Sequence, residues 1–328
     1  MLKYLVKRLL LSIVILLGVS MILYFLVRLM PVDFVQTKID QINQGGAQIP
    51  QETIDAMYTM YGLGDNSFMG ILKGYFKWLG ALVQFDLGTS FLYGDKVLNV
   101  IVNHMGVSFV VAFIAIIFEY MIAIPLGVTA ATHQYSVLDY AVTVFVMIGI
   151  SLPSFFFGQV LKDLFANKLH WFPAATLFDM TSTLPAIVNY MQHLFLPLLT
   201  LIILGIGGTM RYTRTNMLEV LNSDYIRTAR AKGLSERKVV YKHAFRNTMI
   251  PIVTMMAGIL PSLFSGSMIT EQVFDLPGIG NIALKAMTAG DIPFIMGYNM
   301  FLAFLSVIGV LLADIMYGVV DPRVKLAA

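Results

Sequence analysis

Apolar residues in this chain gather into long runs instead of alternating with polar residues. The first run, residues 9–27, carries no charged side chain over the width of a bilayer. A helix needs roughly 20 such residues to cross a membrane. The pattern therefore predicts an all-α polytopic membrane protein with six membrane-spanning helices. The spans are expected at about 9–27, 105–128, 140–161, 194–210, 247–270 and 292–313.

The composition of the chain supports a membrane protein. Of its 328 residues, 58% are hydrophobic and 12% are charged, which is too few charges to cover a globular surface. The chain has no cysteine, which excludes disulfides, thiol catalysis and thiolate metal sites. Its net charge of +3 is small and its basic residues are concentrated in one loop, so nucleic acid is not an expected partner.

The basic residues set the expected orientation in the membrane. Residues 211–246, between the fourth and fifth runs, hold nine Lys and Arg. Because such charge is retained in the cytoplasm, this loop and both termini are predicted inside, an N-in, C-in topology. The turn at 129–139 has no Lys or Arg and neither supports nor opposes this. The first run is too long for a signal peptide and lacks a small-residue cleavage site, so we expect it to be retained.

A more polar stretch after the first run is expected outside the membrane as a small helical segment. In it, Pro50 and Glu52 favour the start of a short helix that Gly62 ends, and a second helix is expected near 70–83. Residues 86–90 form a predicted turn. The expected parts are a spanning helix (1–30), the extracytoplasmic segment (31–104), a core with five spans (105–322) and a cytoplasmic tail (323–328).

The basic loop carries a pattern of its own. Gly233 can take the left-handed conformation that ends a helix, and Ser235 can cap the next helix, so a bend is expected there. Ala229 and Ala231 leave a small-residue surface that another protein can approach closely. One interpretation is that the charges only hold a loop in the cytoplasm. The other is a docking element for a cytoplasmic partner, because a rigid bent helix transmits displacement into the neighbouring spans.

Composition leaves these two interpretations open, and the order of the residues separates them. The loop contains Asp224-Tyr-Ile-Arg-Thr-Ala-Arg-Ala-Lys-Gly233-Leu-Ser, followed by His243-Ala-Phe-Arg-Asn and by Pro251. It resembles the signature loop of permease subunits in ATP-binding cassette (ABC) importers, in the variant of dipeptide and oligopeptide permeases. The common form is Glu-Ala-Ala, three residues, then Gly, and its leading Glu and first Ala are replaced here. The matching positions are Arg227, Thr228, Ala229 and Gly233.

The resemblance extends over nearly the whole chain. It includes the basic first span, the turn at 86–90, the Leu276-Pro-Gly-Ile-Gly280 turn and Asp321-Pro-Arg323. With its long segment after the first span, the chain is similar to the B-type permease subunit. The resemblance implies a type I ABC importer permease fold in a bacterial or archaeal cytoplasmic membrane. The residues that it places in contact with the ATPases are Arg227, Thr228, Ala229, Arg230, Lys232, Gly233, Leu234, Ser235 and Glu236.

The same resemblance implies a function and a set of partners. The function is import of di- or oligopeptides by alternating access. The implied partners are a homologous second permease, two cytoplasmic ATPases and an extracytoplasmic peptide-binding protein. ATP and Mg²⁺ would bind to the ATPases, and no cofactor is expected on this chain.

Several polar or special residues lie within the predicted spans. Glu119 lies in the middle of the second span, where a carboxylate is costly unless it is protonated, paired or facing water. It is a candidate for the substrate pathway, with burial against a polar partner as the alternative. Met268 is the second pathway candidate, because adaptable Met side chains suit a promiscuous path. For Asp314, near the inner end of the last span, we expect a structural role.

Other features allow either packing within the chain or contact with a partner. The glycines at 205–208 permit close helix approach, either to a second permease or within the chain. Glu271 and Asp275 are expected in a solvated outer loop, with contact to a delivery protein as the alternative. Five prolines in or beside spans can each kink a helix. They are Pro125, Pro153, Pro197, Pro251 and Pro261.

No catalytic or metal site is expected on this chain. The sequence has no phosphate-binding Gly-x4-Gly-Lys-Ser/Thr loop, no His-Glu-x-x-His and no Gly-x-Ser-x-Gly, and its five histidines are scattered. A membrane-embedded enzyme therefore lacks a reacting set of residues. Two alternatives stay open: a nickel or metal-chelate ABC importer, and a secondary transporter driven by an ion gradient in which Glu119 carries protons.

Overall fold

The computed structural model describes residues 2–30, 33–44, 50–61, 63, 67–179, 181–255 and 258–320, and these residues form helices joined by turns. The first half holds α1 (Leu2–Arg28), α2 (Phe34–Gln44), α3 (Gln51–Met60), α4 (Phe68–Val83), α5 (Val97–Thr132), α6 (Val137–Ser151), α7 (Ser154–Leu161) and the π-helical η1 (Lys162–Lys168). The second half holds α8 (Ala186–Leu221), α9 (Asp224–Ala231), α10 (Glu236–Lys238), π-helical η2 (Val239–Ala244), α11 (Phe245–Met255), α12 (Ile259–Ser265), α13 (Met268–Val273), α14 (Ile279–Ala289) and α15 (Ile292–Val320).

Four described helices are long and apolar enough to cross a membrane: Arg8–Arg28, Val97–Thr132, Ala186–Leu221 and Ile292–Met316. They correspond to the predicted first, second, fourth and sixth spans. The second, fourth and sixth are longer than the apolar runs, because polar turns at their ends continue the helix. An all-α membrane protein is confirmed, whereas a count of six spans stays a prediction.

The predicted third span, 140–161, is not one straight helix. Asp139–Ser151 and Ser154–Lys168 meet at an angle of 102°. The cause is Pro153, which lacks an N–H and holds the preceding Leu152 in an extended conformation. Lys162 in η1 donates from Nζ to the carbonyl of Val273 (2.7 Å). This hydrogen bond joins η1, which continues α7, to the end of α13.

The predicted fifth span, 247–270, is also wrong as a continuous helix. The chain there divides into α11, α12 and α13, with residues 256–257 outside the described part. Between α12 and α13, Gly266 has φ +67°, a conformation that ends a helix and favours glycine. Broken backbone at membrane depth is tolerated where protein or a water-filled cavity covers it. In this structure α12 packs between α5 and α15.

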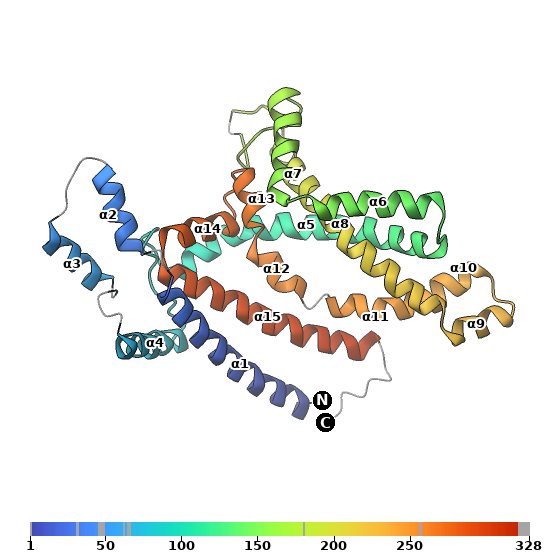
Figure 1. The fold of residues 1–328 in the computed structure, drawn as a ribbon, viewed down its shortest axis with the longest axis horizontal. Helices are drawn as coiled ribbons and strands as arrows, with labels where there is room; N and C mark the ends of the chain where they lie inside the picture. The colour runs from blue at the N-terminus through green and yellow to red at the C-terminus, as the bar shows by residue number, and fades with distance from the viewer. Residues whose placement is uncertain are drawn as a thin grey trace.

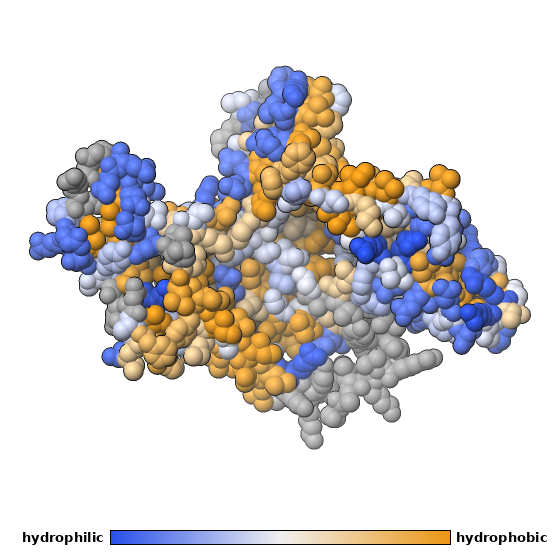
Figure 2. All heavy atoms as spheres, viewed as in Figure 1, coloured by the Kyte–Doolittle hydropathy of each residue, from blue (hydrophilic) through white to orange (hydrophobic). Residues whose placement is uncertain are grey.

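The helices form an elongated bundle with two distinct ends (Figure 1). The segment α2–α4 lies at one end, and α9 with α10 lies at the other. Between them α1 runs beside α15, and α5 packs along α8. Figure 2 shows hydrophilic residues gathered at both ends and on the projection at the top, near α7, with apolar residues over much of the surface between the ends. This distribution fits a bundle that crosses a bilayer along its long axis.

The segment after α1 holds three described helices rather than the two expected. The helix α2 was not predicted, α3 starts after Pro50 as expected, and α4 covers the second predicted helix. Phe34, Tyr61 and Phe91 form a cluster of aromatic rings, with centroids 4.7 to 5.4 Å apart, that joins α2 and the end of α3 to the loop before α5.

Candidate functional site

The basic loop predicted at residues 211–246 is shorter in the structure, because α8 continues as a helix through Leu221. Arg211 and Arg214 are therefore helical residues and not part of a loop. After α8 the chain enters the bent segment, which we define as residues 224–244, comprising α9, α10 and η2. It lies at the end of the bundle opposite α2 (Figure 1).

The bend itself lies where the sequence placed it. Gly233 has φ +74°, and its N–H donates to the carbonyl of Arg230 (2.9 Å), which ends α9. The left-handed conformation predicted for this glycine is confirmed. Ser235 takes the backbone conformation of an N-cap, but its side chain makes no capping hydrogen bond. The predicted side-chain cap is therefore wrong, and only the backbone of Ser235 begins α10.

One face of the bent segment is buried against the chain's own helices. Ile226 and Ala229 of α9 pack with η2 onto the ends of α5 and α8. Ala229 is thus covered by this chain, and the expectation that it offers a surface to a partner is wrong. Ala231 is exposed. The buried members of this cluster are Val128, Ala131, Met217, Leu221, Ile226, Ala229, Val239, Val240 and Ala244.

The other face is charged and accessible. Arg230 and Glu236 form a two-bonded ion pair across the bend, with Nη2 to Oε1 at 2.7 Å and Nε to Oε2 at 3.2 Å. The guanidinium lowers the pKa of the Glu236 carboxyl, so this carboxyl is ionised at neutral pH. Because both side chains are largely exposed, the pair adds little stability. Leu234 is half-buried, whereas the remaining predicted contact residues are exposed: Arg227, Thr228, Lys232, Gly233 and Ser235.

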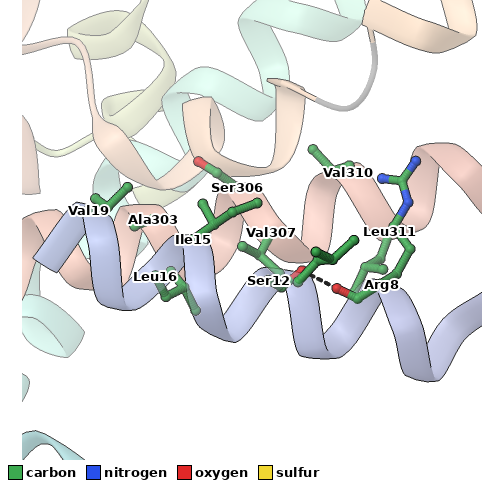
Figure 3. A pocket seen from close by; sticks show the side chains of 11 residues that line it. Arg8, Ser12, Ile15, Leu16, Val19, Ala303, Ser306, Val307, Val310 and Leu311 are labelled. Carbon is green, nitrogen blue, oxygen red and sulfur yellow. Dashed lines mark hydrogen bonds between the residues drawn. The ribbon is translucent and has the colours of Figure 1, made fainter.

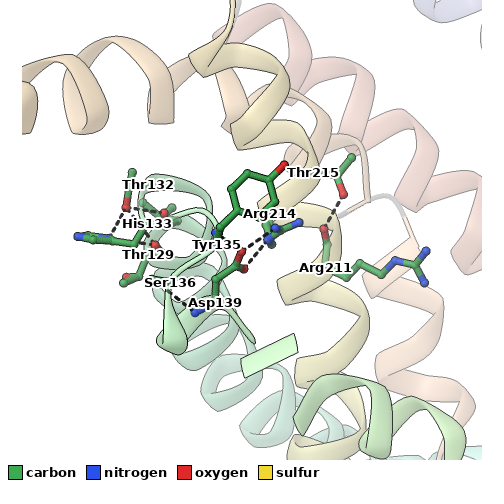
Figure 4. Close-up of polar contacts among 10 residues, drawn as sticks. Thr129, Thr132, His133, Tyr135, Ser136, Asp139, Arg211, Arg214 and Thr215 are labelled. Carbon is green, nitrogen blue, oxygen red and sulfur yellow. Dashed lines mark hydrogen bonds and ion pairs between the residues drawn. The ribbon is translucent and has the colours of Figure 1, made fainter. Parts of the chain in front are cut away.

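A second ion pair joins the first turn of α6 to α8 (Figure 4). Arg214 donates from Nε and Nη2 to the two carboxylate oxygens of Asp139, at 2.8 and 2.9 Å. The N–H of Tyr135 also donates to Asp139 (3.1 Å), and Ser136 caps α6 by accepting from the N–H of Asp139 (3.2 Å). The sequence predicts Arg214 as one of the charged residues of a cytoplasmic loop, and its pairing with Asp139 was missed. The signal available was Ser136 with Asp139 three residues later, the spacing of a helix cap.

We expect Asp139→Asn to destabilise the folded chain by about 3 kcal/mol, because it leaves a mostly buried guanidinium without its anion. The two side chains are 5% and 27% exposed. The measurement is the midpoint of thermal unfolding in detergent. Arg211→Gln is the matched control, since Arg211 is exposed and points away from Asp139 in Figure 4. Equal midpoints for the two variants would contradict a stabilising pair.

The two pathway candidates lie against different parts of the chain. Glu119 accepts a hydrogen bond from Thr209 and lies over Gly205, where any side chain on the glycine would overlap its carboxylate. It is half-buried in the contact between α5 and α8. Met268 begins α13, where it is half-buried against the cluster of α5, α14 and α15. The structure therefore gives each an intramolecular contact and does not bring them together.

The glycines at 205–208 serve packing within this chain at two positions. Gly205 accommodates Glu119, and Gly207 lies against Ile150 of α6, where an added Cβ would stand 2.8 Å from a side-chain carbon. A Cβ added at Gly208 would meet nothing within 4 Å besides its own helix. Of the two alternatives for this cluster, internal packing holds for the first two glycines.

Glu271 was expected in a solvated loop, and this is wrong, because its side chain is fully buried. Its carboxylate accepts from the hydroxyl of Ser108 (2.6 Å) and from the N–H groups of Ser267 (3.1 Å) and Asn281 (3.0 Å). Three glycines make room for it: Gly266, Gly278 and Gly280. Asp275, four residues later, is exposed as expected.

Another buried carboxylate, Asp291, was missed. It accepts from the hydroxyl of Ser90 (2.5 Å) and from the N–H groups of Leu92 (3.0 Å) and Phe294 (3.1 Å). It therefore joins the loop before α5 to the start of α15. Burial and the charge of Asp291 raise the pKa of nearby Tyr93 to about 12, so this phenol stays protonated at neutral pH.

Asp314 has the structural role expected of it. Its carboxylate lies 2.8 Å from the guanidinium of Arg8, so it pairs α15 with the start of α1. The same two helices line a groove of about 630 Å³, with Ile15 and Leu16 on one side and Ala303 and Val307 on the other (Figure 3). Its lining is mainly apolar, as expected for a surface that faces lipid.

The arrangement of the helices is similar to that of a solved membrane protein chain. The structure aligns with a chain of the MetNI methionine ABC transporter in an inward-facing conformation, with a TM-score of 0.51. The alignment covers 68% of this chain and 97% of that chain at 16% identity. At this identity the likeness concerns the fold alone, and the fold is that of an ABC transporter's membrane chain.

The chain belongs to the family of binding-protein-dependent transport system inner membrane components, which matches residues 123–326. The oligopeptide transport system permease protein AppB of Bacillus subtilis (strain 168) is 37% identical over 99% of this chain and 100% of its own length. The dipeptide transport system permease protein DppB of the same organism is 36% identical over 77% of this chain and 79% of its own length. A putative peptide transport system permease protein of Brucella abortus (strain 2308) is 35% identical over 97% of this chain and 98% of its own length. The resemblance found in the sequence is confirmed.

Proposed function

We propose that this chain is the B-type permease subunit of an ATP-driven importer that moves di- or oligopeptides into the cytoplasm. The observation that carries the proposal is the bent segment, whose buried face is continuous with α5 and α8 while its charged face is accessible. Full-length similarity to peptide permeases supports the substrate class.

The geometry supports a way to couple ATP hydrolysis to transport. Two partner ATPases bind ATP and Mg²⁺ and change their separation during hydrolysis, and one of them contacts the exposed face of the bent segment. Because Ile226 and the η2 residues pack on Met217 and Val128, a displacement of the segment moves the ends of α5 and α8 with it. Both helices are long enough to carry this displacement across the bilayer and open the pathway alternately to each side.

The proposed orientation is N-in, C-in with six spans. The bent pair α6 and α7 makes the third span, and α11 to α13 together make the fifth. The bent segment is then cytoplasmic, and α2–α4 face the peptide-binding protein outside. A homologous second permease completes the pathway in a bacterial or archaeal cytoplasmic membrane, and this chain is neither an ATPase nor a cofactor-binding subunit.

Two features of the transport pathway belong to this proposal. Glu119 is half-buried in the contact between α5 and α8, and the proposal is that the exposed part of its carboxyl faces the pathway. Met268 stands at the break between α12 and α13, and discontinuous helices mark substrate sites in transporters. Nickel-chelate import is the competing substrate class, and a proton-coupled carrier is the competing mechanism.

Purification and labelling test the assembly and the orientation. We expect the tagged chain in mild detergent to co-purify with a second permease and two ATPases. Because the chain has no native cysteine, Thr59→Cys on α3 and Lys242→Cys on η2 can be labelled individually. A membrane-impermeant thiol reagent should label position 59 in intact cells and position 242 only after permeabilisation. Purification of a lone chain, or the reverse labelling, would contradict the proposal.

A further inference from the structure

The helix α4 lies across the end of α1 at the edge of the predicted membrane. Its N-cap is Ser67, whose hydroxyl accepts from the N–H of Gly70 (3.1 Å). Gly74 lets α4 approach Tyr24 so closely that any side chain at position 74 would overlap the phenol. Tyr75 is buried beside α1 and hydrogen-bonds with Ser20 (3.0 Å between the hydroxyl oxygens). The position of α4 is therefore fixed to the last turns of a spanning helix.

The face of α4 turned away from α1 carries an apolar stripe. Met69, Phe76 and Val83 follow one another at intervals of seven residues, which places them on one side of the helix. They are 59%, 61% and 75% exposed. Such a row of large apolar side chains, at the end of a membrane helix, indicates an environment other than water.

A basic stripe runs beside the apolar one. Lys73 and Lys77 are both exposed and one turn apart, and α4 contains no acidic residue. Within the described part of the chain, neither lysine takes part in an ion pair. A helix with an apolar face bordered by lysines is typical of one that lies in the membrane interface.

The location of α4 agrees with its composition. The spanning part of α1 ends at Arg28, and α4 lies beside this end in Figure 1. In that view α4 is seen nearly end-on and α1 from the side, so the two helices cross at a large angle. In Figure 2 the apolar surface along α1 continues onto α4. Trp78 packs against the buried rings of Tyr24 and Tyr75, so an aromatic cluster fixes α4 to the end of α1.

We propose that α4 is a membrane-interface anchor that binds anionic phospholipid headgroups through Lys73 and Lys77, with Met69, Phe76 and Val83 among the acyl chains. Long lysine side chains keep their ammonium groups at headgroup level while their stems lie over apolar surface. On the proposed orientation this lipid belongs to the outer leaflet. The anchor holds the outer end of α1. Lipid binding by α4 can be measured without ATP or peptide, so its test is independent of the transport assay.

The depth of α4 can be measured directly, because single cysteines introduced into this cysteine-free chain take spin labels specifically. The labelled positions are Met69→Cys, Phe76→Cys and Val83→Cys, with Thr59→Cys on the exposed face of α3 as the control. The quantity measured is the accessibility of each spin label to oxygen and to a water-soluble nickel chelate, in nanodiscs that contain phosphatidylglycerol. We expect the three α4 labels to be accessible to oxygen and shielded from the nickel chelate. The Thr59 label should be accessible to the nickel chelate and less accessible to oxygen. Labels on α4 that are as open to the nickel chelate as Thr59 would overturn the proposal. So would α4 labels that become shielded only when a second permease or a binding protein is added.

The headgroup preference has its own test. We expect Lys73→Gln combined with Lys77→Gln to lower the retention of phosphatidylglycerol relative to phosphatidylcholine on the purified full chain, by about fivefold for each lysine. Lys285→Gln, an exposed lysine on α14, is the matched control and should change nothing. Equal retention by the double variant and by the control would overturn the role of these two lysines.

Discussion

Gly233→Pro should abolish peptide uptake, with a loss of at least about tenfold per inserted complex. Proline fixes φ near −65°, whereas Gly233 has φ +74°, so the bend cannot form as it stands. The substitution also removes the N–H that donates to Arg230 at the end of α9. The exposed face of the bent segment would then lose its fixed position on α5 and α8, and hydrolysis by the ATPases would no longer be coupled to transport. The measurement is uptake together with ATP hydrolysis by the same preparation.

Gly94→Pro is the matched control for this experiment. Gly94 also has a positive φ (+67°), is exposed, and donates from its N–H to the carbonyl of Ser90 (3.0 Å), but it lies in the loop before α5. We expect this variant to keep the ratio of peptide transported to ATP hydrolysed. Gly233→Ala should fall between, because a residue with a Cβ tolerates positive φ at a cost of about 1 kcal/mol. Unchanged uptake in Gly233→Pro would remove the bent segment from the mechanism.

Glu271→Ala should produce the largest loss of stability, roughly 4 kcal/mol. The substitution leaves the part-buried N–H of Ser267, the buried N–H of Asn281 and the hydroxyl of Ser108 without their acceptor, and it opens a cavity beside three glycines. These groups hold α13 to α5 and to the start of α14. We expect a much lower yield of monodisperse protein and a lower midpoint of thermal unfolding.

Two further variants separate size from hydrogen bonding at this position. Glu271→Gln keeps the volume but replaces one acceptor oxygen with a donor, so its midpoint should lie between wild type and Glu271→Ala. Asp275→Asn removes an exposed charge four residues away at a position with φ +49°, which Asn tolerates, and should leave the stability within about 0.5 kcal/mol of the wild-type value. A Glu271→Ala protein as stable as Asp275→Asn would show that the buried hydrogen bonds do not hold this region.

The sequence predicted the long spans and the bend at Gly233, because both depend on local information. The length of an apolar run is enough to predict a membrane-spanning helix. A glycine between two basic helical patterns is enough to predict the end of one helix and a turn. The sequence could not predict which proline bends a helix. Pro125, Pro197 and Pro251 lie inside continuous helices, whereas Pro153 stands between two helices at 102°. The outcome depends on what neighbouring helices pack against each position.

The polar contacts between distant elements were the least predictable part. Glu271 resembled a loop carboxylate, since its partner Ser108 is 163 positions away and its space is made by glycines on separate turns. The same holds for Asp291 with Ser90 and for Asp139 with Arg214, which pair across 201 and 75 positions. A hydropathy pattern counts such residues as surface or loop charge. The three-dimensional structure is needed to show that these carboxylates are buried and that their hydrogen bonds are made.

The most direct test of the proposed importer is transport by the assembled complex in proteoliposomes. Labelled peptide and its binding protein are supplied on the side of α2–α4, and ATP on the side of the bent segment. We expect peptide to accumulate only with hydrolysable ATP, and collapse of the proton gradient to change nothing. Accumulation by this chain alone, driven by a proton gradient without ATP, would contradict the importer and support a secondary carrier.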